Sequence, residues 1–327
     1  MHRRILLATP ALALATRALA QGEAAAWPDR PVRIVVPYPP GGSNDILARI
    51  LAEALRERLG QPFVIENRAG AGGNIGADTV AKAAPDGATL LLTAPGPFAI
   101  NDQVYRSMPY DPARDLVPVA LVATVPIVLM VTNSLPVHSV AELLALAKTQ
   151  PGKLSFGSSG NASTNHLAGE LLKTMAGINI THIPYRGAAP AMTDLINGTL
   201  SLMFDNMPGS ILQIRDGRVR ALAVAGSERA PVLPELPIVA EAGGPALAGF
   251  EAEAWFGLAA PSGTPAALVE RINHDVRAAL SLRQVQLRYA EAGATASTLD
   301  APGFARFVAT EREKWGKVVR ASGARAE

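Results

Sequence analysis

The sequence IVVPYPPGGSNDILARILAEAL, residues 34–55, joins a strand, a glycine-rich loop and a helix in immediate succession. Residues 32–36 form a short, nearly continuous apolar run, which is typical of a strand buried on both faces. From Asp45 onward the apolar residues recur with helical spacing, and Gly60 ends the predicted helix. A second stretch, LSFGSSGNASTNHLAGELLKTM at residues 154–175, repeats this order. We therefore expect each stretch to open one α/β domain.

Strand and helix signals alternate along most of the remaining chain. Further strands are predicted at residues 63–65, 89–93, 126–131, 178–185, 200–204, 219–225 and 254–259, and helices at 77–84 and 140–148. Alternation at this spacing favours parallel strands, and so an α/β fold class. With 327 residues the chain exceeds the roughly 250–300 residues at which single cores stop growing. We assign residues 27–130 with 250–327 to domain 1 and 131–249 to domain 2, with an interdomain ligand cleft. The alternative is one large doubly wound sheet.

The first twenty residues, MHRRILLATPALALATRALA, have the pattern of a secretory signal peptide. Arg3 and Arg4 precede an apolar middle, and small residues end the segment at Ala20, where cleavage is expected. The apolar part is too short to span a membrane, and a buried N-terminal helix is the alternative. Because the twin-arginine pattern is matched only loosely, Sec export is favoured. We predict that residues 1–20 are removed and that the mature protein is periplasmic.

The composition argues against several classes of protein. Without cysteine the chain has no disulfide, thiolate zinc site or iron–sulfur cluster. Removing residues 1–20 takes away three arginines, so 30 Lys and Arg become 27 against 28 Asp and Glu, a net charge near −1. This charge, together with only 5% aromatic residues, argues against a nucleic-acid partner.

Signatures of enzymes and cofactor sites do not fit the sequence. Residues 70–76, GAGGNIG, lack the G-x-G-x-x-G spacing of a dinucleotide-binding loop. Asn161 occupies the last glycine position of a G-x-S-x-G nucleophile elbow. The histidines show no paired spacing that would suit a metal. We therefore expect no cofactor, no metal and no catalytic residue.

The loop between the first strand and its helix is the first candidate ligand site. Glycines let the backbone approach a ligand closely, and free N–H groups at the start of a helix attract anions without any basic side chain. In the alternative interpretation, Asn44 or Asp45 simply caps the helix. The candidate residues are Gly41, Gly42, Ser43, Asn44 and Asp45.

Comparable groups follow several later strands, at the edge where open parallel sheets usually bind ligands. Arg186 is a cation that could pair with a carboxylate, and a surface ion pair is the alternative. His166 lies in the first turn of its predicted helix, where a packed or solvated histidine is the alternative to ligand contact. The candidate residues are Thr93, Gly96, Ser158, Ser159, Gly160, Ser163, Thr164, His166, Arg186, Gly187, Ala188 and Asp205.

Four motifs together resemble a known family: WPDRPVRIVVPYPPGGSNDILARILAEAL, NRAGAGGNIGADTVAKAAPDGATLL, LSFGSSGNASTNHLAGELL and IPYRGAAPAMTDLINGTLSLMFDN. Over essentially the whole mature chain the sequence resembles the Bug family of periplasmic solute-binding proteins, which are related to the tripartite tricarboxylate transporter. The resemblance implies two Rossmann-like domains in a periplasmic-binding-protein (type II-like) flytrap arrangement. It also implies ligands that are small carboxylates, such as di- and tricarboxylates, acidic amino acids or aromatic acids.

The resemblance further implies which loops hold the ligand. The loop matching Tyr38–Asp45 would hold a ligand carboxylate, partly through bridging waters, and the loops matching 93–96, 158–164, 185–188 and Asp205 would complete the pocket. Pro39-Pro40 and Ala94-Pro95-Gly96 depart from the family's usual small or small polar residues.

These observations predict a solute-binding protein that captures a small organic carboxylate and catalyses nothing. Its expected partners are the membrane subunits of a tripartite tricarboxylate-type transporter, and a monomer is expected. A ligand sensor for a signalling receptor is one alternative. A serine hydrolase or lyase that uses Ser158 or Ser159 with His166 is another.

Overall fold

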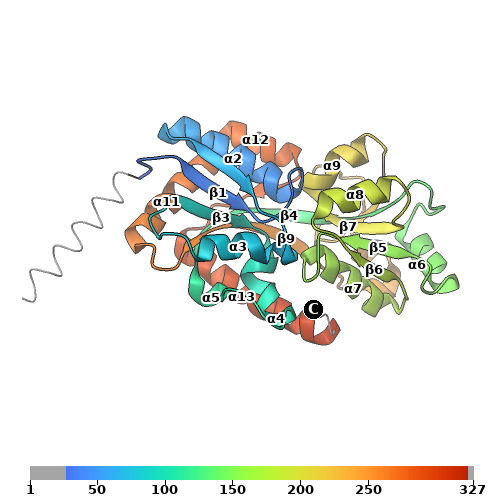
Figure 1. Cartoon of the computed structure of the whole chain (residues 1–327). Helices are drawn as coiled ribbons and strands as arrows, with labels where there is room; N and C mark the ends of the chain where they lie inside the picture. The colour runs from blue at the N-terminus through green and yellow to red at the C-terminus, as the bar shows by residue number, and fades with distance from the viewer. Residues whose placement is uncertain (1–26, 323–327) are drawn as a thin grey trace, which may run out of the picture.

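The structure is a computed structural model, and it describes residues 27–322 (Figure 1). The predicted signal peptide, residues 1–20, lies outside the described residues. None of the helices in the described part of the chain is both long and apolar enough to span a bilayer.

The described strands form one mixed sheet with the order β2-β1-β3-β9-β4-β7-β5-β6, and β8 and β10 also pair with β4. The strands are β1 (Val32–Val36), β2 (Phe63–Asn67), β3 (Thr89–Thr93), β4 (Leu116–Val131), β5 (Ser155–Ser158), β6 (Thr181–Pro184), β7 (Leu202–Asn206), β8 (Arg220–Val224), β9 (Glu253–Pro261) and β10 (Thr295–Ala296). β1 pairs in parallel with β2 and β3, and β5 pairs in parallel with β6 and β7. The expected parallel pairing is confirmed in both stretches that the sequence singled out.

The long strand β4 joins two lobes. Its first part pairs antiparallel with β9 as far as Pro126, and its last part pairs antiparallel with β7 from Ile127 onward. We call the side with β1, β2, β3, β9 and β10 the first lobe, and the side with β5 to β8 the second lobe. β4 begins ten residues before the strand expected at 126–131. Pro118 and Pro126 interrupt the strand signal in the sequence, because proline cannot donate a hydrogen bond to a neighbouring strand. The pairing of β4 with β9 continues past Pro118 with a shift in register between Pro118 and Ala120.

Helices cover both lobes, and the C-terminal helices return to the first lobe (Figure 1). The α-helices are α2 (Ser43–Leu59), α3 (Asn74–Ala81), α4 (Asn101–Val104), α5 (Pro112–Asp115), α6 (Val140–Thr149), α7 (Thr164–Ala176), α8 (Ala188–Ile196), α9 (Met207–Arg215), α10 (Val239–Ala242), α11 (Ala266–Leu280), α12 (Arg283–Glu291) and α13 (Ala301–Ser322). Shorter turns are η1 (Ala71–Gly73), the π-helical η2 (Gly96–Ile100) and η3 (Gly244–Leu247). α11 and α12 contact α2, so the last part of the chain packs on the first. The predicted boundaries of domains 1 and 2 remain a prediction.

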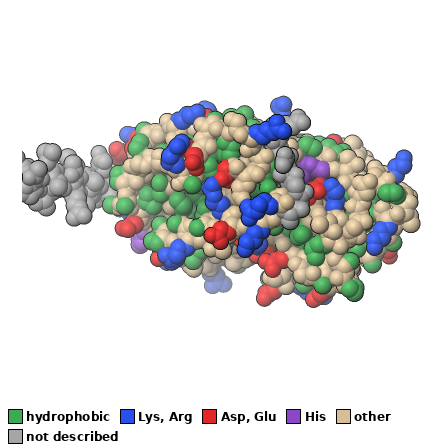
Figure 2. Space-filling model, turned by 90° about the horizontal axis from the view of Figure 1, so that it is seen from below, with side chains coloured by type: hydrophobic (Ala, Val, Ile, Leu, Met, Phe, Trp, Pro, Cys, Tyr) green, Lys and Arg blue, Asp and Glu red, His purple; other side chains and the backbone are tan. Residues whose placement is uncertain are grey.

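The core explains why the repeated stretches fold as they do. In α2 the face with Leu47, Leu51 and Leu55 is fully buried, and β3 is buried along its whole length. Burial of an apolar side chain of this size stabilises the fold by roughly 1.5–3 kcal/mol. Most charged residues, by contrast, lie on the surface, and basic and acidic side chains are intermixed on the face shown in Figure 2; Asp45, Asp205, Asp275 and Glu311 are buried exceptions.

Candidate functional site

Loops from the two lobes meet around one small cavity, which we call the central cavity. β1 and β3 lead into it from the first lobe, and β5 and β7 from the second, so the carboxyl ends of parallel strands face each other. The cavity has a volume of about 20 Å³, which is room for about one water molecule. Its lining residues are Tyr38, Pro39, Gly42, Ser43, Asn44, Ala94, Gly96, Ser159, Ser163, Thr164, Asn165, Ala188 and Asn206.

Three helices begin beside this cavity at N-cap residues whose own side chains do not cap them, and within residues 27–322 only α9 of these has a first-turn N–H, that of Gly209, bonded to another side chain, Ser43. The N-cap residues are Gly42 for α2, Gly187 for α8 and Asn206 for α9, and none of them makes a capping hydrogen bond through a side chain. α7 differs, because the Ser163 hydroxyl accepts the N–H of His166 at its start. The first N–H groups of a helix have no partner within the helix and carry partial positive charge. Both lobes therefore offer backbone donors to an anion.

Asp45 holds the loop before α2 in place and does not line the central cavity itself. Its carboxylate accepts the Gly41 N–H at 3.0 Å, Arg49 Nε at 2.9 Å and Asn67 Nδ2 at 3.1 Å. Burial acts to raise the pKa of Asp45, but these hydrogen bonds together hold it below its usual value. The interpretation in which Asn44 or Asp45 caps α2 is wrong, because the helix begins at Ser43 and its N-cap is Gly42.

Ser43 connects the two lobes directly. Its hydroxyl accepts the N–H of Gly209 at 3.0 Å and donates to the carbonyl of Asn206 at 3.3 Å. The side chain is buried, so water competes little for these hydrogen bonds. Ser43 therefore ties the start of α2 to the start of α9 across the cleft.

Two asparagines line the central cavity from opposite lobes. Asn44 belongs to α2, and Asn206 ends β7. The side-chain oxygen Oδ1 of each is buried, and within residues 27–322 neither accepts a hydrogen bond. A buried amide oxygen without a donor is costly, and such atoms in folded proteins mark a bound water, strain or function. Asn206 was not among the predicted site residues, although it directly follows Asp205.

Two larger cavities adjoin the central one. The α8–α9 cavity, of about 250 Å³, shares Gly42 and Ala188 with it and is also lined by Gly41, Met192, Asp205, Gly209, Gln213 and Arg218, among others. The tyrosine cavity, of about 220 Å³, shares Tyr38 and Ser159 and is also lined by residues 70–73, Tyr105, Gly160, Asn161, Pro184, Tyr185 and Arg186.

The two adjoining cavities differ in charge. Arg218 in the α8–α9 cavity donates to Gln213 at 3.0 Å, and the buried carboxylate of Asp205 lies in the same lining. Arg186 makes no ion pair within the described residues, and no acidic residue lines the tyrosine cavity. The tyrosine cavity is therefore the more favourable of the two for an anionic group.

Asp205 is a buried acid at the carboxyl end of β7. It accepts hydrogen bonds from Ser210 Oγ at 2.8 Å and Asn165 Nδ2 at 3.2 Å. Burial raises the pKa of Asp205 to about 6, although these hydrogen bonds oppose the rise. Residues of the second lobe therefore hold this carboxylate by hydrogen bonds. Because its pKa is about 6, the carboxyl group gains a proton as the pH falls just below neutrality.

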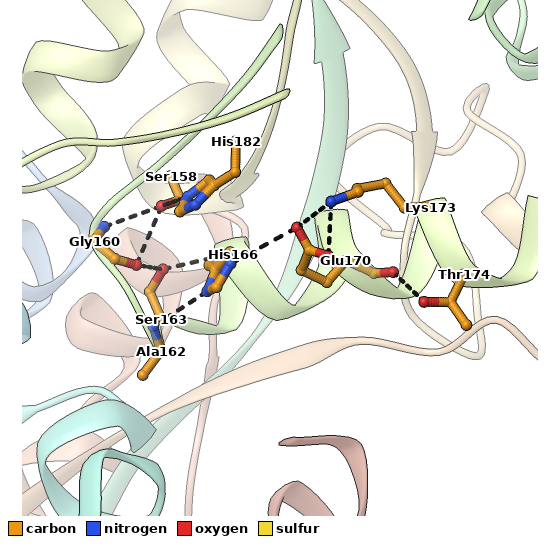
Figure 3. Close-up of polar contacts among 9 residues, drawn as sticks. All are labelled: Ser158, Gly160, Ala162, Ser163, His166, Glu170, Lys173, Thr174 and His182. Carbon is orange, nitrogen blue, oxygen red and sulfur yellow. Dashed lines mark hydrogen bonds and ion pairs between the residues drawn. The ribbon is translucent and has the colours of Figure 1, made fainter. Parts of the chain in front are cut away.

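Ser158 pairs with a different histidine from the one that the hydrolase alternative invoked (Figure 3). Ser158 Oγ lies 2.7 Å from His182 Nε2, and the ring of His182 stacks on that of His166 with 4.0 Å between centroids. The strands explain this pairing. Phe156 and Ser158 lie on one face of β5, and His182 pairs in register with Phe156 on β6. The pairing of Ser158 or Ser159 with His166 is therefore wrong: His166 Nδ1 accepts the Ala162 N–H, and Ser159 donates to Asn165.

Ser158 and the two histidines act as a buried support for the loop at 159–164. Ser158 is fully buried, and its hydroxyl also bonds the backbone of Gly160. Burial lowers the pKa of His166 to about 4, and burial together with the neighbouring His166 and Lys173 lowers the pKa of His182 to about 3. Both imidazoles are therefore neutral near pH 7.

Most of the predicted site residues line one of the three cavities. Asp45, Thr93, Ser158, His166 and Gly187 do not. Gly187 is buried with a φ of 140°, and a Cβ atom there would lie 2.5 Å from Pro39 Cδ of the other lobe.

Some of the lining residues were not predicted from the sequence. Tyr105, Gln213 and Arg218 carry no local signal, because only the tertiary fold brings them to the cleft. In the described part of the chain, no cluster of three or more acidic or histidine side chains is arranged to hold a metal ion.

Comparison with known proteins shows the family and the fold. The family described as "Tripartite tricarboxylate transporter family receptor" matches residues 47–324. BugT of Bordetella pertussis is 40% identical over 327 residues, which cover 99% of each chain. The R. palustris protein Rpa4515, solved with adipate, superimposes with a TM-score of 0.89 at 44% identity, covering 91% of this chain and 99% of the other.

MatC from Rhodopseudomonas palustris, solved with bound malate, has a TM-score of 0.84 at 34% identity and covers 90% of this chain and 100% of its own. The periplasmic binding protein BugD is also similar, with a TM-score of 0.87 at 36% identity and coverage of 92% of this chain and 100% of its own. The predicted resemblance and the two-lobed α/β fold are confirmed. The chain belongs to the receptor family of tripartite tricarboxylate transporters, which includes the Bug proteins.

Proposed function

We propose that this protein is a periplasmic solute-binding receptor that captures a small organic carboxylate between its two lobes and delivers it for transport. The observation that carries the proposal is the meeting of two uncapped helix starts, α2 of the first lobe and α8 of the second, around one cavity between the lobes. Backbone N–H groups at helix starts bind anions without a basic side chain. The relatives solved with adipate and malate support a carboxylate as the ligand.

The lobes supply complementary parts of the binding site. Gly42 to Asn44 present the start of α2, while Ser163, Thr164 and Ala188 present groups of the second lobe. Arg186 adds the cation of the tyrosine cavity, where a second acidic group of the ligand would lie. A ligand that contacts both lobes stabilises the closed arrangement relative to an open one, which is how flytrap receptors signal occupancy.

Export and delivery complete the proposal. Residues 1–20 would direct the chain out of the cytoplasm and be removed, and the mature protein would act as a monomer. Its partners would be the membrane subunits of a tripartite tricarboxylate-type transporter.

The proposal is tested by calorimetric titration of the purified protein with a panel of di- and tricarboxylates, acidic amino acids and aromatic acids, against amines and neutral sugars. We expect binding of at least one acid and none of the cations or sugars. Mass spectrometry of the recovered acid tests the hydrolase alternative at the same time, because a binding protein returns its ligand unchanged. Turnover of the acid, or binding confined to uncharged solutes, contradicts the proposal.

A further inference from the structure

We infer that helix α13 is a positioning element for ligand binding: anchored in the first lobe, it holds the ligand loop at residues 159–164 of the second lobe in place. The inference rests on the proposed function and adds the part of the fold that fixes the binding groups. It starts from the course of α13, which contacts η2 of the first lobe and α7 of the second. Figure 1 shows the last turns of α13 beside α7.

Both contacts of α13 lead to the central cavity. η2 begins at Gly96 and α7 begins at Thr164, and both of these residues line that cavity. Within residues 27–322, no residue of α13 itself lines any of the three cavities. One helix outside the cleft is therefore in contact with an element of each lobe that carries a cavity-lining residue.

Buried polar contacts fix α13 to the first lobe. The buried carboxylate of Glu311 accepts the indole N–H of Trp255 at 2.9 Å and that of Trp315 at 2.8 Å. Gln103 Nε2 donates to the carbonyl of Arg312 at 3.1 Å. Hydrogen bonds to an ionised group are stronger than those between neutral groups, so this pair of indoles holds the helix firmly. The last turns of α13 thus present a fixed surface to the second lobe.

An apolar cluster, which we call the interlobe cluster, joins this surface to the second lobe. Trp315 and Val319 of α13 are buried in it together with Ala162 and Leu167 of the second lobe. In the part of the chain that the structure describes, all its other buried members belong to the first lobe. Ala162 and Leu167 are therefore inserted into the core of the opposite lobe, where burial of apolar surface favours their position.

Ala162 links the interlobe cluster to the ligand loop. It is fully buried and has a φ of 63°, a left-handed conformation that costs free energy for any residue with a Cβ atom. Such strain persists where the surroundings hold the residue, and here the methyl group is buried in the cluster. Its neighbours Asn161 and Ser163 line ligand cavities. The buried methyl group therefore fixes the loop between two residues of the binding site.

The interlobe cluster affects ligand affinity because its members come from both lobes. The contact between α13 and α7 is made only while the lobes lie in this arrangement, and a ligand held between the lobes favours the same arrangement. The contact therefore adds to affinity by as much as it stabilises this arrangement relative to one in which the lobes have moved apart. Trp315 and Val319 act in this way through Ala162, without touching the ligand.

Calorimetry and thermal unfolding of the mature protein separate affinity from stability. The probes are adipate, malate, glutamate and citrate, and the acid that binds most tightly is used. In Ala162→Gly we expect affinity to fall about fourfold, the equivalent of one buried methyl group, while the melting temperature stays the same or rises because glycine removes the strain. In Val319→Ala we expect affinity to fall by about four- to fifteenfold.

Phe307→Ala is the matched control on the same helix. Phe307 packs on Trp255 of the first lobe, with 5.5 Å between ring centroids. Loss of this contact should lower the melting temperature and leave affinity unchanged. A purely structural role of α13 predicts instead that affinity follows the melting temperature in all three variants, and that result overturns the inference.

Hydrogen exchange of the ligand-free protein tests the same contact without any ligand. Val319→Ala should speed amide exchange at residues 159–164, in the other lobe, whereas Phe307→Ala should not. Unchanged exchange at residues 159–164 in Val319→Ala overturns the inference, while the proposed function stands. Failure of all four acids to bind the unaltered protein counts against the proposed function, and the exchange measurement still decides whether α13 positions the loop.

Discussion

The hydroxyl of Ser43 accepts the N–H of Gly209 at 3.0 Å, and this hydrogen bond spans the cleft. Gly209 lies in α9 of the second lobe, and Ser43 begins α2 of the first. Because the same hydroxyl donates to the carbonyl of Asn206, one side chain joins the start of α2 to the start of α9. The two lobes are thus held together across the cleft partly by protein–protein hydrogen bonds.

Ser43→Ala removes this connection between the lobes. We expect ligand affinity to fall by about 2- to 12-fold, since a net hydrogen bond is worth roughly 0.5–1.5 kcal/mol, with the loss mainly in the dissociation rate. Surface plasmon resonance gives both rates, and small-angle scattering should show a larger radius of gyration. Ser281→Ala, at an exposed helix end, is the matched control and should change neither measurement. Unaltered dissociation from the Ser43 variant contradicts the role.

Gly187→Ala should prevent full closure. A Cβ atom at Gly187 would lie 2.5 Å from Pro39 Cδ, and these two residues belong to different lobes. We expect ligand affinity to fall at least tenfold and the scattering profile with ligand to remain that of a more open molecule. Gly177→Ala controls for backbone strain, because Gly177 also has a positive φ but has open space around its Cβ position. That control should lose stability by roughly 1 kcal/mol and keep its affinity.

Asp45→Asn separates support of the loop from ligand contact. The carboxylate holds Gly41, Arg49 and Asn67, so its replacement should lower the free energy of unfolding by about 1–3 kcal/mol and weaken binding as well. Urea unfolding of the ligand-free protein measures the first effect and calorimetry the second. A large loss of affinity with unchanged stability would instead mean that Asp45 touches the ligand.

Arg186→Gln should weaken the binding of dianionic ligands more than that of monoanions. The guanidinium lies in a cavity without acidic lining, whereas Arg218 in the other cavity is held by Gln213. We expect a loss of about tenfold for a dicarboxylate and a weaker salt dependence of its affinity. Arg218→Gln is the matched control with a smaller effect. The reverse order of the two variants places the second acidic group in the α8–α9 cavity.

The histidine pair predicts how stability depends on pH. Burial lowers the pKa of His182 from 6.5 to about 3 and that of His166 to about 4. As the pH falls from about 6.5 towards 4, the unfolded chain therefore binds protons that the folded chain does not, and stability decreases. Asp205 acts in the opposite sense, since its raised pKa of about 6 lets the folded state gain a proton first.

Thermal unfolding between pH 7 and pH 4.5 measures these contributions. The melting temperature should fall less steeply with acidification in His182→Gln than in the unaltered protein, and more steeply in Asp205→Asn. Gln keeps a polar group opposite Ser158, so the comparison isolates protonation from the loss of a hydrogen bond. Parallel curves for all three proteins would show that neither the histidines nor Asp205 controls acid sensitivity.

The order of elements was readable from the sequence because it depends on local spacing. The apolar period of residues 34–55 changes from strand to helix within one loop, and β1 and α2 form there as expected. α2 begins at Ser43, two residues before the predicted start at Asp45. Its N-cap is Gly42, which has no side chain and so gives no capping signal in the sequence. The strand β4 was largely missed because its prolines break the local signal while pairing with β9 sustains it.

The α/β architecture, the lack of thiol chemistry and the glycine-rich turns at the helix starts all follow from the residue pattern. Which distant side chains come together depends instead on the folded arrangement: Ser43 meets Gly209 and Asn44 lies opposite Asn206 between the lobes, and Ser158 meets His182 inside the second lobe. The physical reason is separation along the chain. Local periodicity fixes an element's own geometry, but contacts between residues 24 to 166 positions apart depend on how whole lobes pack.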